Sequence, residues 1–284
     1  MSAPQDWKLM DLVRWTADFF RSHDVPSPRL DAELLLAHVL DLERMDLYLA
    51  FDQPVSAGDR ARFRELVRRR AKERWPVAYL TGVREFWSMS FRVTPDVLIP
   101  RPETELLVRV AADLKPRRLV ELGVGSGCVS AALARELPDA EIAAIDCSPA
   151  ALEIARENLA ALGLGERVAL YEASGLAGLE GPFDLVVSNP PYVPAGELDG
   201  LAPELRHEPR LALDGGPDGL HAVRRLCAEA PALLERPGYL ALEIGAGQAD
   251  AVEDLLRAAG AGVVERFPDL AGIPRVLLGR FLEA

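Results

Sequence analysis

Apolar residues recur at every third or fourth position through the first quarter of the chain, which is the spacing of amphipathic helices. The pattern predicts one helix over residues 7–20 and a second that begins at Ser27-Pro28, where a capping serine precedes a proline suited to the first helical turn. A third helix is predicted over 56–75, where arginines occupy most positions outside the apolar stripe. The first 75 residues therefore predict a small helical domain.

The spacing of apolar residues changes after residue 75. Short apolar stretches with Thr81-Gly82 between them predict a β-hairpin within residues 76–100. From Glu103 onward, strand-like and helix-like segments alternate, which is typical of an open, mainly parallel α/β sheet. The expected strands are 118–122, 141–146, 167–172, 183–188, 239–244, 262–266 and 275–280. The expected helices are 103–113, 126–136, 149–162, 218–235 and 249–259.

The length of the chain agrees with a division into two domains. Its 284 residues exceed the usual size of a single hydrophobic core, and 49% are hydrophobic against 27% charged, as in ordinary soluble globular proteins. We expect a helical domain over 1–75, a linking hairpin over 76–100 and an α/β domain over 101–284. No apolar run is long enough for a membrane span and residues 1–11 lack a secretory pattern, so a cytoplasmic protein without membrane contact is expected.

Charge separates the two parts of the chain. Residues 1–75 hold 13 acidic and 13 basic side chains, so the remaining residues carry the whole formal net charge of −12. This is the wrong sign for a protein that grips a phosphate backbone over a wide face. The arginine-rich helix 56–75 has two interpretations, a solvated face or a docking surface for an RNA-rich or acidic partner such as the ribosome.

Cysteine and histidine spacing gives no sign of a metal site. Three cysteines are an odd number without a CxxC pair, and the four histidines show no paired ligand spacing, so no metal is expected. Cys128, at a predicted helix start, is interpreted as a packing residue. His207 beside Glu208 is interpreted as a loop hydrogen-bonding residue rather than half of an acid/base pair.

The first chemically informative motif is the loop Gly123-Val124-Gly125-Ser126-Gly127, between predicted strand 118–122 and a predicted helix. Such a turn brings backbone N–H groups close to a ligand. Asp146 ends the next predicted strand, 23 residues after Gly123, where a carboxylate can accept hydrogen bonds from both hydroxyls of a ribose. Glu121 would repel a diphosphate but suits the cationic methionine part of S-adenosyl-L-methionine (AdoMet). The loop therefore favours AdoMet over a dinucleotide.

The second motif, Asn189-Pro190-Pro191-Tyr192, directly follows predicted strand 183–188. The prolines restrict the backbone, so the Pro190 carbonyl and the Asn189 amide oxygen are directed as two fixed hydrogen-bond acceptors. Two acceptors suit an NH2 group, which is a weak nucleophile in an amide or exocyclic amine because its lone pair is delocalised. They can orient that nitrogen toward an electrophilic methyl group while Tyr192 covers the site. Together, the two motifs predict methyl transfer from AdoMet to an NH2 nitrogen.

Nearly end to end, the chain resembles the HemK/PrmC family, the N5-glutamine methyltransferases of peptide chain release factors. Beyond the two motifs, the signature stretches of the family appear as Tyr79-Leu80-Thr81-Gly82, Leu98-Ile99-Pro100-Arg101-Pro102-Glu103-Thr104-Glu105, Glu208-Pro209, 212–220, Glu243-Ile244-Gly245, and Asp269-Leu270-Ala271-Gly272 followed by Arg275. The resemblance implies a class I (Rossmann-like) α/β methyltransferase sheet of seven strands, with a small N-terminal helical domain and a linking β-hairpin.

The resemblance also implies the reaction and its residues. A methyl group would pass from AdoMet to a glutamine in the Gly-Gly-Gln loop of class 1 release factors, modulating translation termination and leaving S-adenosyl-L-homocysteine, without a metal. The helical domain would recognise the release factor. The residues expected to be catalytic are Asn189, Pro190 and Tyr192, and substrate binding adds Pro191 and Arg101. The residues expected to bind the cofactor are Glu121, Gly123, Val124, Gly125, Ser126, Gly127, Asp146, Cys147, Ser174, Gly175 and Asn189.

Two positions depart from the family pattern. Members of the family commonly have Asp-Trp after the third strand, near the adenine, where this chain has Ser174-Gly175. The adenine contact is therefore left open, although Ser174 can still form a hydrogen bond. The predicted hairpin has Ser88 where a glycine is usual, which affects a turn but no proposed chemistry.

Two other functions fit parts of the sequence. DNA adenine and rRNA guanine amino-methyltransferases share the (Asn/Asp)-Pro-Pro-(Tyr/Phe) arrangement, but a catalytic half at −12 would repel nucleic acid, so no direct DNA contact is expected. A non-catalytic AdoMet-binding or ribosome-associated adaptor would use the basic helix 56–75. The complete Asn189-Pro190-Pro191-Tyr192 motif argues against that alternative.

Overall fold

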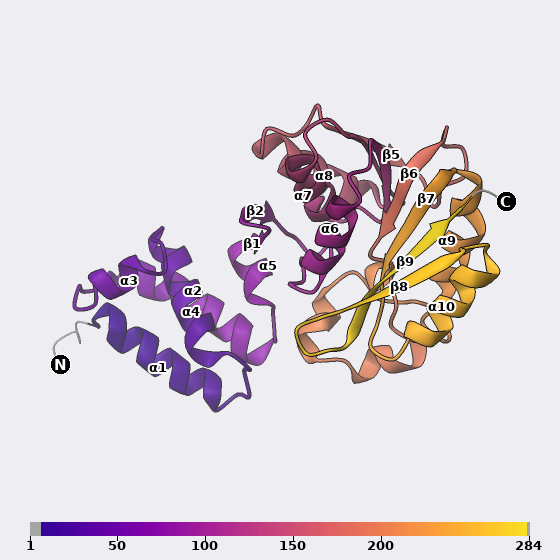
Figure 1. The fold of residues 1–284 in the computed structure, drawn as a ribbon. Helices are drawn as coiled ribbons and strands as arrows, with labels where there is room; N and C mark the ends of the chain where they lie inside the picture. The colour runs from indigo at the N-terminus through magenta and orange to yellow at the C-terminus, as the bar shows by residue number, and fades with distance from the viewer. Residues whose placement is uncertain (1–6, 283–284) are drawn as a thin grey trace, which may run out of the picture. The chain divides into compact units, whose positions relative to one another are not determined.

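The structure, a computed structural model, describes residues 7–282. The described residues divide into two compact units (Figure 1). The first unit takes the chain up to Val83 together with the distant segment 202–207, and the second takes 84–201 and the residues from 208 onward. The sequence pattern gives no sign that 202–207 belongs with the N-terminal helices. The expected domain boundaries at residues 75 and 100 stay predictions.

The first unit is helical. Its helices are α1 (Leu9–Arg21), α2 (Pro28–Leu40), α3 (Asp46–Leu49), α4 (Ala57–Lys72) and α5 (Val77–Thr81). Their apolar faces meet in one core that contains the fully buried side chains of Phe20, Leu35 and Leu36. The short strand expected before Thr81-Gly82 is a helical turn instead. Pro76 precedes a helical turn there, and Gly82 ends the turn in the left-handed conformation at φ +77°.

Two arginines bind the segment 202–207: Arg70 in α4, and Arg74 just after the end of this helix. Arg70, which the sequence pattern places on the exposed basic face, is instead buried, and pairs with Asp31 at 2.7 Å and with Glu204 at 2.8 Å. Arg74 pairs with the same Glu204 carboxylate at 2.7 Å. These pairs, with carboxylates on both sides of Arg70, explain why a charged side chain is buried in the helical unit.

The second unit is built on a seven-stranded sheet with strand order β5-β4-β3-β6-β7-β9-β8. Its strands are β3 (Arg118–Leu122), β4 (Glu141–Asp146), β5 (Val168–Glu172), β6 (Phe183–Ser188), β7 (Leu234–Glu243), β8 (Val263–Pro268) and β9 (Pro274–Phe281). Neighbouring strands from β5 to β7 are parallel, whereas β9 runs antiparallel to both β7 and β8. The seven-stranded class I fold expected from the sequence is confirmed.

Helices cover both faces of this sheet (Figure 1). One face packs against α6 (Thr104–Asp113), α7 (Cys128–Glu136) and α8 (Pro149–Ala161), and the other against α9 (His221–Glu229) and α10 (Ala249–Ala258). Adjacent residues such as Leu119 and Val120 therefore enter opposite cores, which is why both of these β3 residues are apolar. The helix expected over 218–235 ends early, because Pro231 interrupts it and Leu234 already pairs with Phe183 in the sheet.

A two-stranded hairpin precedes the sheet in the chain. Its strands are β1 (Val83–Phe86) and β2 (Met89–Arg92). The two turn residues, Trp87 and Ser88, both have left-handed backbone conformations, at φ +51° and +54°. A turn of this kind favours glycine or asparagine, so Ser88 adopts the conformation that a glycine would take more readily.

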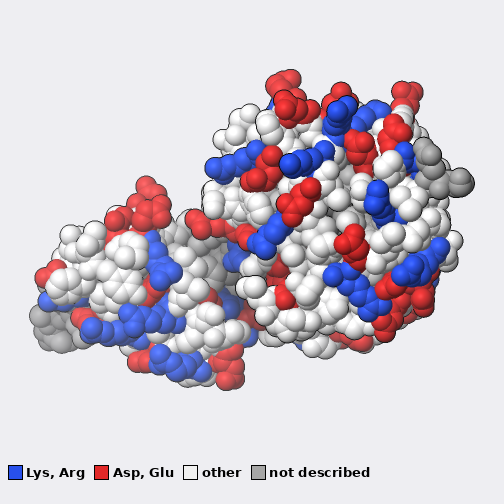
Figure 2. All heavy atoms as spheres, viewed as in Figure 1, with Lys and Arg blue, Asp and Glu red and all other residues white. Residues whose placement is uncertain are grey.

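The charged surface is mixed. On the face shown in Figure 2, acidic and basic side chains are interspersed over the seven-stranded unit and form no broad basic surface. Among the helices of residues 7–282, none combines the length and apolar character required to span a bilayer.

Candidate functional site

A cavity of about 450 Å³ lies where four parallel strands end. The chain leaves β3 toward β4 and β5 on one side, whereas β6 and β7 follow on the other. In open α/β sheets this reversal of strand order leaves a crevice at the carboxyl ends of the strands, where ligands bind. The lining comes from the ends of β3, β4, β5 and β6, from residues around 96–104, and from the segment 209–226.

The glycine loop after β3 forms the floor of the cavity. Gly123 and Gly125 have φ values of +85° and +52°, which side chains disfavour. The backbone N–H groups of Gly123 and Val124 donate to the Ile145 carbonyl at 2.8 and 3.0 Å, which ties the loop to β4. Val124 and Ser126 also line the cavity. Gly127 does not; a Cβ there would lie 3.4 Å from Ala155, so this glycine lets α8 approach the loop.

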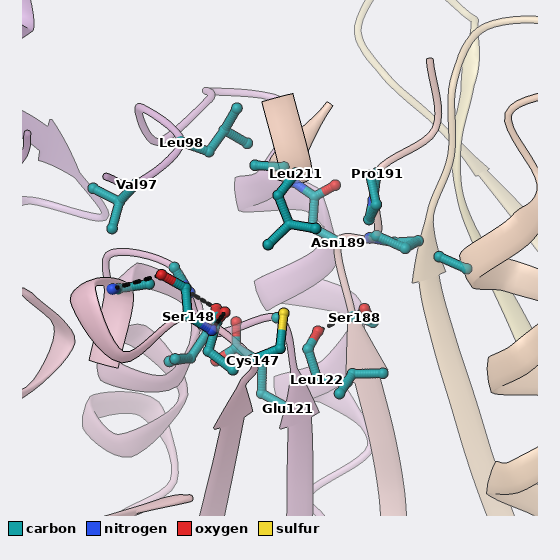
Figure 3. Close-up of a pocket in the computed structure, with 18 of the residues that line it drawn as sticks. Val97, Leu98, Glu121, Leu122, Cys147, Ser148, Ser188, Asn189, Pro191 and Leu211 are labelled. Atoms are coloured by element: carbon teal, nitrogen blue, oxygen red, sulfur yellow. Dashed lines mark hydrogen bonds between the residues drawn. The ribbon is translucent and has the colours of Figure 1, made fainter. Parts of the chain in front are cut away.

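Asp146 and Cys147 extend the cavity across the end of β4. One Asp146 carboxylate oxygen accepts a hydrogen bond from the Gly125 N–H at 2.9 Å, and the other accepts one from the Ser148 N–H at 3.0 Å. These two bonds fix the orientation of the carboxylate in the cavity. Figure 3 shows the Cys147 sulfur pointing into the same space.

Glu121 is a buried carboxyl group at the bottom of the cavity. The Ser130 hydroxyl donates to it, and it forms no ion pair with any other residue between 7 and 282. Burial, with a smaller contribution from the nearby Asp146 charge, raises the pKa of Glu121 to about 8. The site therefore holds a carboxyl group that a bound cation would stabilise in its ionised form.

Asn189 stands at the end of β6, across the cavity from Glu121 and Cys147 (Figure 3). Its amide Nδ2 donates to the Thr104 hydroxyl oxygen at 3.2 Å, which leaves the amide oxygen Oδ1 as the acceptor for a ligand. Thr104 also hydrogen-bonds the buried Glu243 carboxyl, whose pKa burial raises to about 7. The preceding Ser188 hydroxyl donates to the Leu122 carbonyl at 2.7 Å and joins the ends of β6 and β3.

The three residues that follow Asn189 in the Asn-Pro-Pro-Tyr motif do not all line the cavity. Pro190 and Pro191 line the cavity, but Tyr192 does not. The Tyr192 carbonyl accepts a hydrogen bond from Gln248 Nε2 at 3.0 Å, and a Cβ at Gly245 would lie 3.1 Å from the Tyr192 ring. The glycine of the Glu243-Ile244-Gly245 stretch therefore lets this ring pack. Burial raises the pKa of the Tyr192 hydroxyl.

Arg101 lines the cavity, and an ion pair with Glu208 holds its side chain there. Its guanidinium lies 2.5 Å from Glu208, which also accepts the Ile99 N–H at 3.2 Å. The signature stretch that contains Ile99 and Arg101 therefore contacts the Glu208-Pro209 stretch through the Glu208 carboxylate. His207 and Glu208 form no pair with each other: His207 Nε2 contacts the Glu73 carbonyl at 2.8 Å.

The residues that line the cavity and that sequence reasoning missed include Thr104, Leu211, His221 and Arg225. Among the expected cofactor residues, Ser174 lines the cavity and Gly175 does not. Cys128 belongs to the hydrophobic core and also lines the cavity, and burial raises the pKa of its thiol to about 12. Within the described part of the chain, no cluster of three or more histidine, cysteine, aspartate or glutamate side chains is arranged to hold a metal.

Four features define a class I AdoMet-dependent methyltransferase. They are the mixed seven-stranded sheet, the glycine loop after its first strand, the acidic residue that ends its second strand, and the Asn-Pro-Pro-Tyr motif after its fourth strand. Two family models match this chain: the PrmC N-terminal domain over residues 11–82 and the methyltransferase small domain over residues 102–216. Release factor glutamine methyltransferases match it at nearly full length. That of Geobacter sulfurreducens is 42% identical over 281 residues, covering 98% of each chain. That of Moorella thermoacetica is 46% identical over 260 residues, covering 89% of this chain and 92% of the relative. The chain therefore belongs to the release factor glutamine methyltransferase family.

Solved structures share the fold at much lower sequence identity. The hMettl16 catalytic domain, in complex with a MAT2A 3′UTR hairpin, has a TM-score of 0.59 and 17% identity, over 73% of this chain and 81% of that chain. A methyltransferase from Pyrococcus furiosus has a TM-score of 0.54 and 18% identity, over 69% of this chain and 90% of that chain. At this level of identity, both show the class I fold alone.

Proposed function

We propose that this chain methylates the side-chain amide nitrogen (N5) of a glutamine in the Gly-Gly-Gln loop of class 1 peptide chain release factors, and so modulates translation termination. The observation that carries the proposal is the Asn189 amide, which Thr104 holds through Nδ2 so that Oδ1 is the acceptor for a ligand. Names of relatives at 42–46% identity support the choice of substrate.

The residues present fit AdoMet. Glu121 offers a buried carboxylate to an ammonium group, and Asp146 retains lone pairs for two ribose hydroxyls beyond its bonds to the backbone. The cavity volume of about 450 Å³ suits a ligand of this size. When bound, AdoMet supplies an electrophilic methyl group on a sulfonium sulfur, and S-adenosyl-L-homocysteine is the product that leaves. The proposal includes no metal.

Asn189 and Pro190 would hold the substrate amide. Their two carbonyl oxygens accept the two N–H bonds of an NH2 group, which fixes the direction in which its nitrogen faces. A carboxylate has no donors for these acceptors, so glutamate is excluded. Pro191 and Arg101 would contact neighbouring substrate atoms, and Tyr192 would support the motif. No strong base is required if the amide proton leaves after methyl transfer.

We also propose that the helical unit recognises the release factor, with the arginine-rich helix α4 as a candidate ribosome contact, and that the enzyme is cytoplasmic. DNA is not a proposed substrate. A net charge of −12, carried outside residues 1–75, opposes binding of a phosphate backbone.

Mass spectrometry of a release factor incubated with this enzyme and AdoMet tests the proposal. We expect one added methyl group on the loop glutamine, and none when that glutamine is replaced by glutamate. Asn189→Ala should lower kcat by roughly 10²- to 10³-fold, as when one positioned donor is removed from an active site, with AdoMet affinity largely retained. Methylation of duplex adenine at a rate equal to that of the release factor would contradict the proposal.

The Thr104 hydroxyl supplies a finer test of the same mechanism. In Thr104→Val the Asn189 amide loses the partner that selects its orientation, so kcat should fall by ~2- to 10-fold, in line with the net value of one hydrogen bond. In the Asn189→Ala background the same exchange should have no further effect. Thr16→Val, a matched exchange of a buried threonine in α1, serves as the control for a general packing effect. Additive losses at 104 and 189 would show that the two residues act separately.

A further inference from the structure

The cavity wall beyond β5 contains a side chain from a distant helix. Ser174 and Gly175 follow β5, and Gly175 contributes no side chain to the wall. A Cβ built on Gly175 would overlap the guanidinium group of Arg225, in α9. Arg225 lines the cavity, together with Ala222 and Leu226 of the same helix. The space that a side chain at 175 would fill is therefore taken by Arg225, and a Glu229 carboxylate oxygen lies 2.7 Å from the same Cβ position.

Glu229 holds the Arg225 guanidinium in this position through two hydrogen bonds, one with Arg225 and one with the loop after β5. The Arg225 Nε donates to one Glu229 carboxylate oxygen at 2.8 Å, one helical turn further along α9. The other Glu229 oxygen accepts the Leu176 N–H at 2.7 Å, directly after Gly175. Glu229 thus ties the loop after β5 to α9 and fixes the guanidinium between them. The Arg225 side chain is 37% exposed, so part of it remains accessible to a ligand.

The position of this wall identifies which part of a ligand it meets. Across the sheet the order is β6, β3, β4, β5, which corresponds to Asn189, Glu121, Asp146 and Ser174. If the methionine part of AdoMet meets Glu121 and its ribose meets Asp146, the base must extend past β4 toward the end of β5. Arg225 also interacts electrostatically with Cys147, which flanks the same end of the cavity.

We infer that the planar guanidinium of Arg225 forms the adenine-binding wall of the cavity, stacking on the face of the base where position 175 offers no side chain. The inference rests on the proposed function, because it takes AdoMet as the ligand. A guanidinium suits this role since it is planar, weakly hydrated and attracted to π faces. Glu229 acts as a positioning residue that holds the plane.

Calorimetric titration with S-adenosyl-L-homocysteine tests the inference without turnover. Arg225→Ala should weaken binding by roughly 5- to 150-fold, the range for loss of one base-stacking side chain. Arg224→Ala is the matched control, because Arg224 is the preceding residue of α9, pairs with Asp218 and does not line the cavity. Arg224→Ala should leave the affinity unchanged. Equal affinities for wild type and Arg225→Ala would overturn the inference but not the proposed function, whereas a wild type that binds neither AdoMet nor this product would overturn both.

Two further variants separate stacking from a structural role. Arg225→Lys keeps the charge for Glu229 but loses the plane, so its affinity should resemble that of Arg225→Ala; full affinity would show that the ion pair alone matters. Gly175→Trp in the Arg225→Ala background directs a new aromatic face into the vacated space once the Glu229 side chain, 2.7 Å from the new Cβ, moves aside, and should regain affinity. No gain in a variant that melts at the temperature of the wild type would contradict the stacking role.

A base analogue tests the mode of contact. S-inosylhomocysteine differs from the adenosyl product at the edge of the base but presents a similar face. Because stacking is tolerant of base identity, Arg225→Ala should weaken binding of both ligands by the same factor. A changed preference between the two would show that Arg225 hydrogen-bonds the edge of the base instead.

Discussion

Glu121 and Glu243 are buried carboxyl groups on opposite sides of the residues proposed to carry the reaction. Burial raises the pKa of Glu121 to about 8 and that of Glu243 to about 7, well above ordinary glutamates. Ionisable groups with pKa values shifted this far are common at functional sites, because such sites use burial and neighbouring charges to tune ionisation. Glu121 forms no ion pair with any described residue, whereas Glu243 hydrogen-bonds Thr104, the residue that accepts the Asn189 amide N–H.

The raised pKa of Glu121 predicts how stability depends on pH without ligand. Between about pH 4.5 and 8 the folded state keeps a proton on Glu121 that the unfolded state has lost, so the free energy of unfolding should fall as pH rises through this window. Glu121→Gln should lessen that fall, because glutamine does not titrate. Urea unfolding of both proteins at pH 5, 6.5 and 8 measures the difference. Parallel pH profiles would show that Glu121 is ionised throughout.

Helix α4 shows that the interior of the helical unit depends on a charged residue. Arg70 is held between Asp31 of α2 and Glu204, whose segment is far along the chain. A buried pair adds little stability compared with apolar residues of the same size, but removal of one partner leaves the other charges without compensation. The pKa of Asp31 is raised by burial even with Arg70 present, which indicates how strongly this environment disfavours an unpaired carboxylate.

Replacement of Arg70 should therefore destabilise the helical unit. We expect Arg70→Met to lower its free energy of unfolding by ~3–5 kcal/mol. Arg62→Met on the same helix removes an exposed ion pair with Asp59 and one hydrogen bond to the Val39 carbonyl, and should cost ~1–2 kcal/mol. Urea unfolding followed by tryptophan fluorescence compares the two variants. Equal effects would mean that Arg70 contributes no more than a surface arginine.

Elements and residues differ in how far sequence could predict them. Strands β3, β4 and β6 were predicted with their bounds, because a strand buried on both faces is a continuous apolar run. Asp146 and Asn189 were predicted to share a site, since parallel strands bring their carboxyl ends to one edge. Thr104 and Arg225 could not be predicted in this way. Each reaches the cavity through a contact with a residue at least 50 positions away, and such contacts depend on topology rather than local pattern.

At the scale of the whole molecule, the chain passes between its two units three times. It leaves the helical unit after Val83, returns for 202–207, and leaves again. The residues that follow this return, Pro209 and Leu211, line the cavity. The methyltransferase unit nevertheless contains every lining residue of the cavity, because none falls within 1–83 or 202–207.

This division predicts separate effects of truncation. A chain without residues 1–75 should retain binding of S-adenosyl-L-homocysteine within a few-fold, because the cavity is complete, but should lose most kcat/KM toward an intact release factor. Calorimetry and methylation of the whole factor measure the two properties. Full kcat/KM in the truncated chain would contradict the proposed recognition role of the helical unit. Loss of cofactor binding in a folded truncated chain would show that the cavity depends on the helices.

The return of the chain at 202–207 also limits how parts of related enzymes can be exchanged. The Trp75 ring stacks on His207 with centroids 4.4 Å apart, and Glu204 pairs with both Arg70 and Arg74. A chimera that takes residues 1–83 from one relative and the remainder from another would join helices and a segment that never evolved together. A functional exchange of recognition units therefore requires two grafts, with 202–207 transplanted alongside the N-terminal helices.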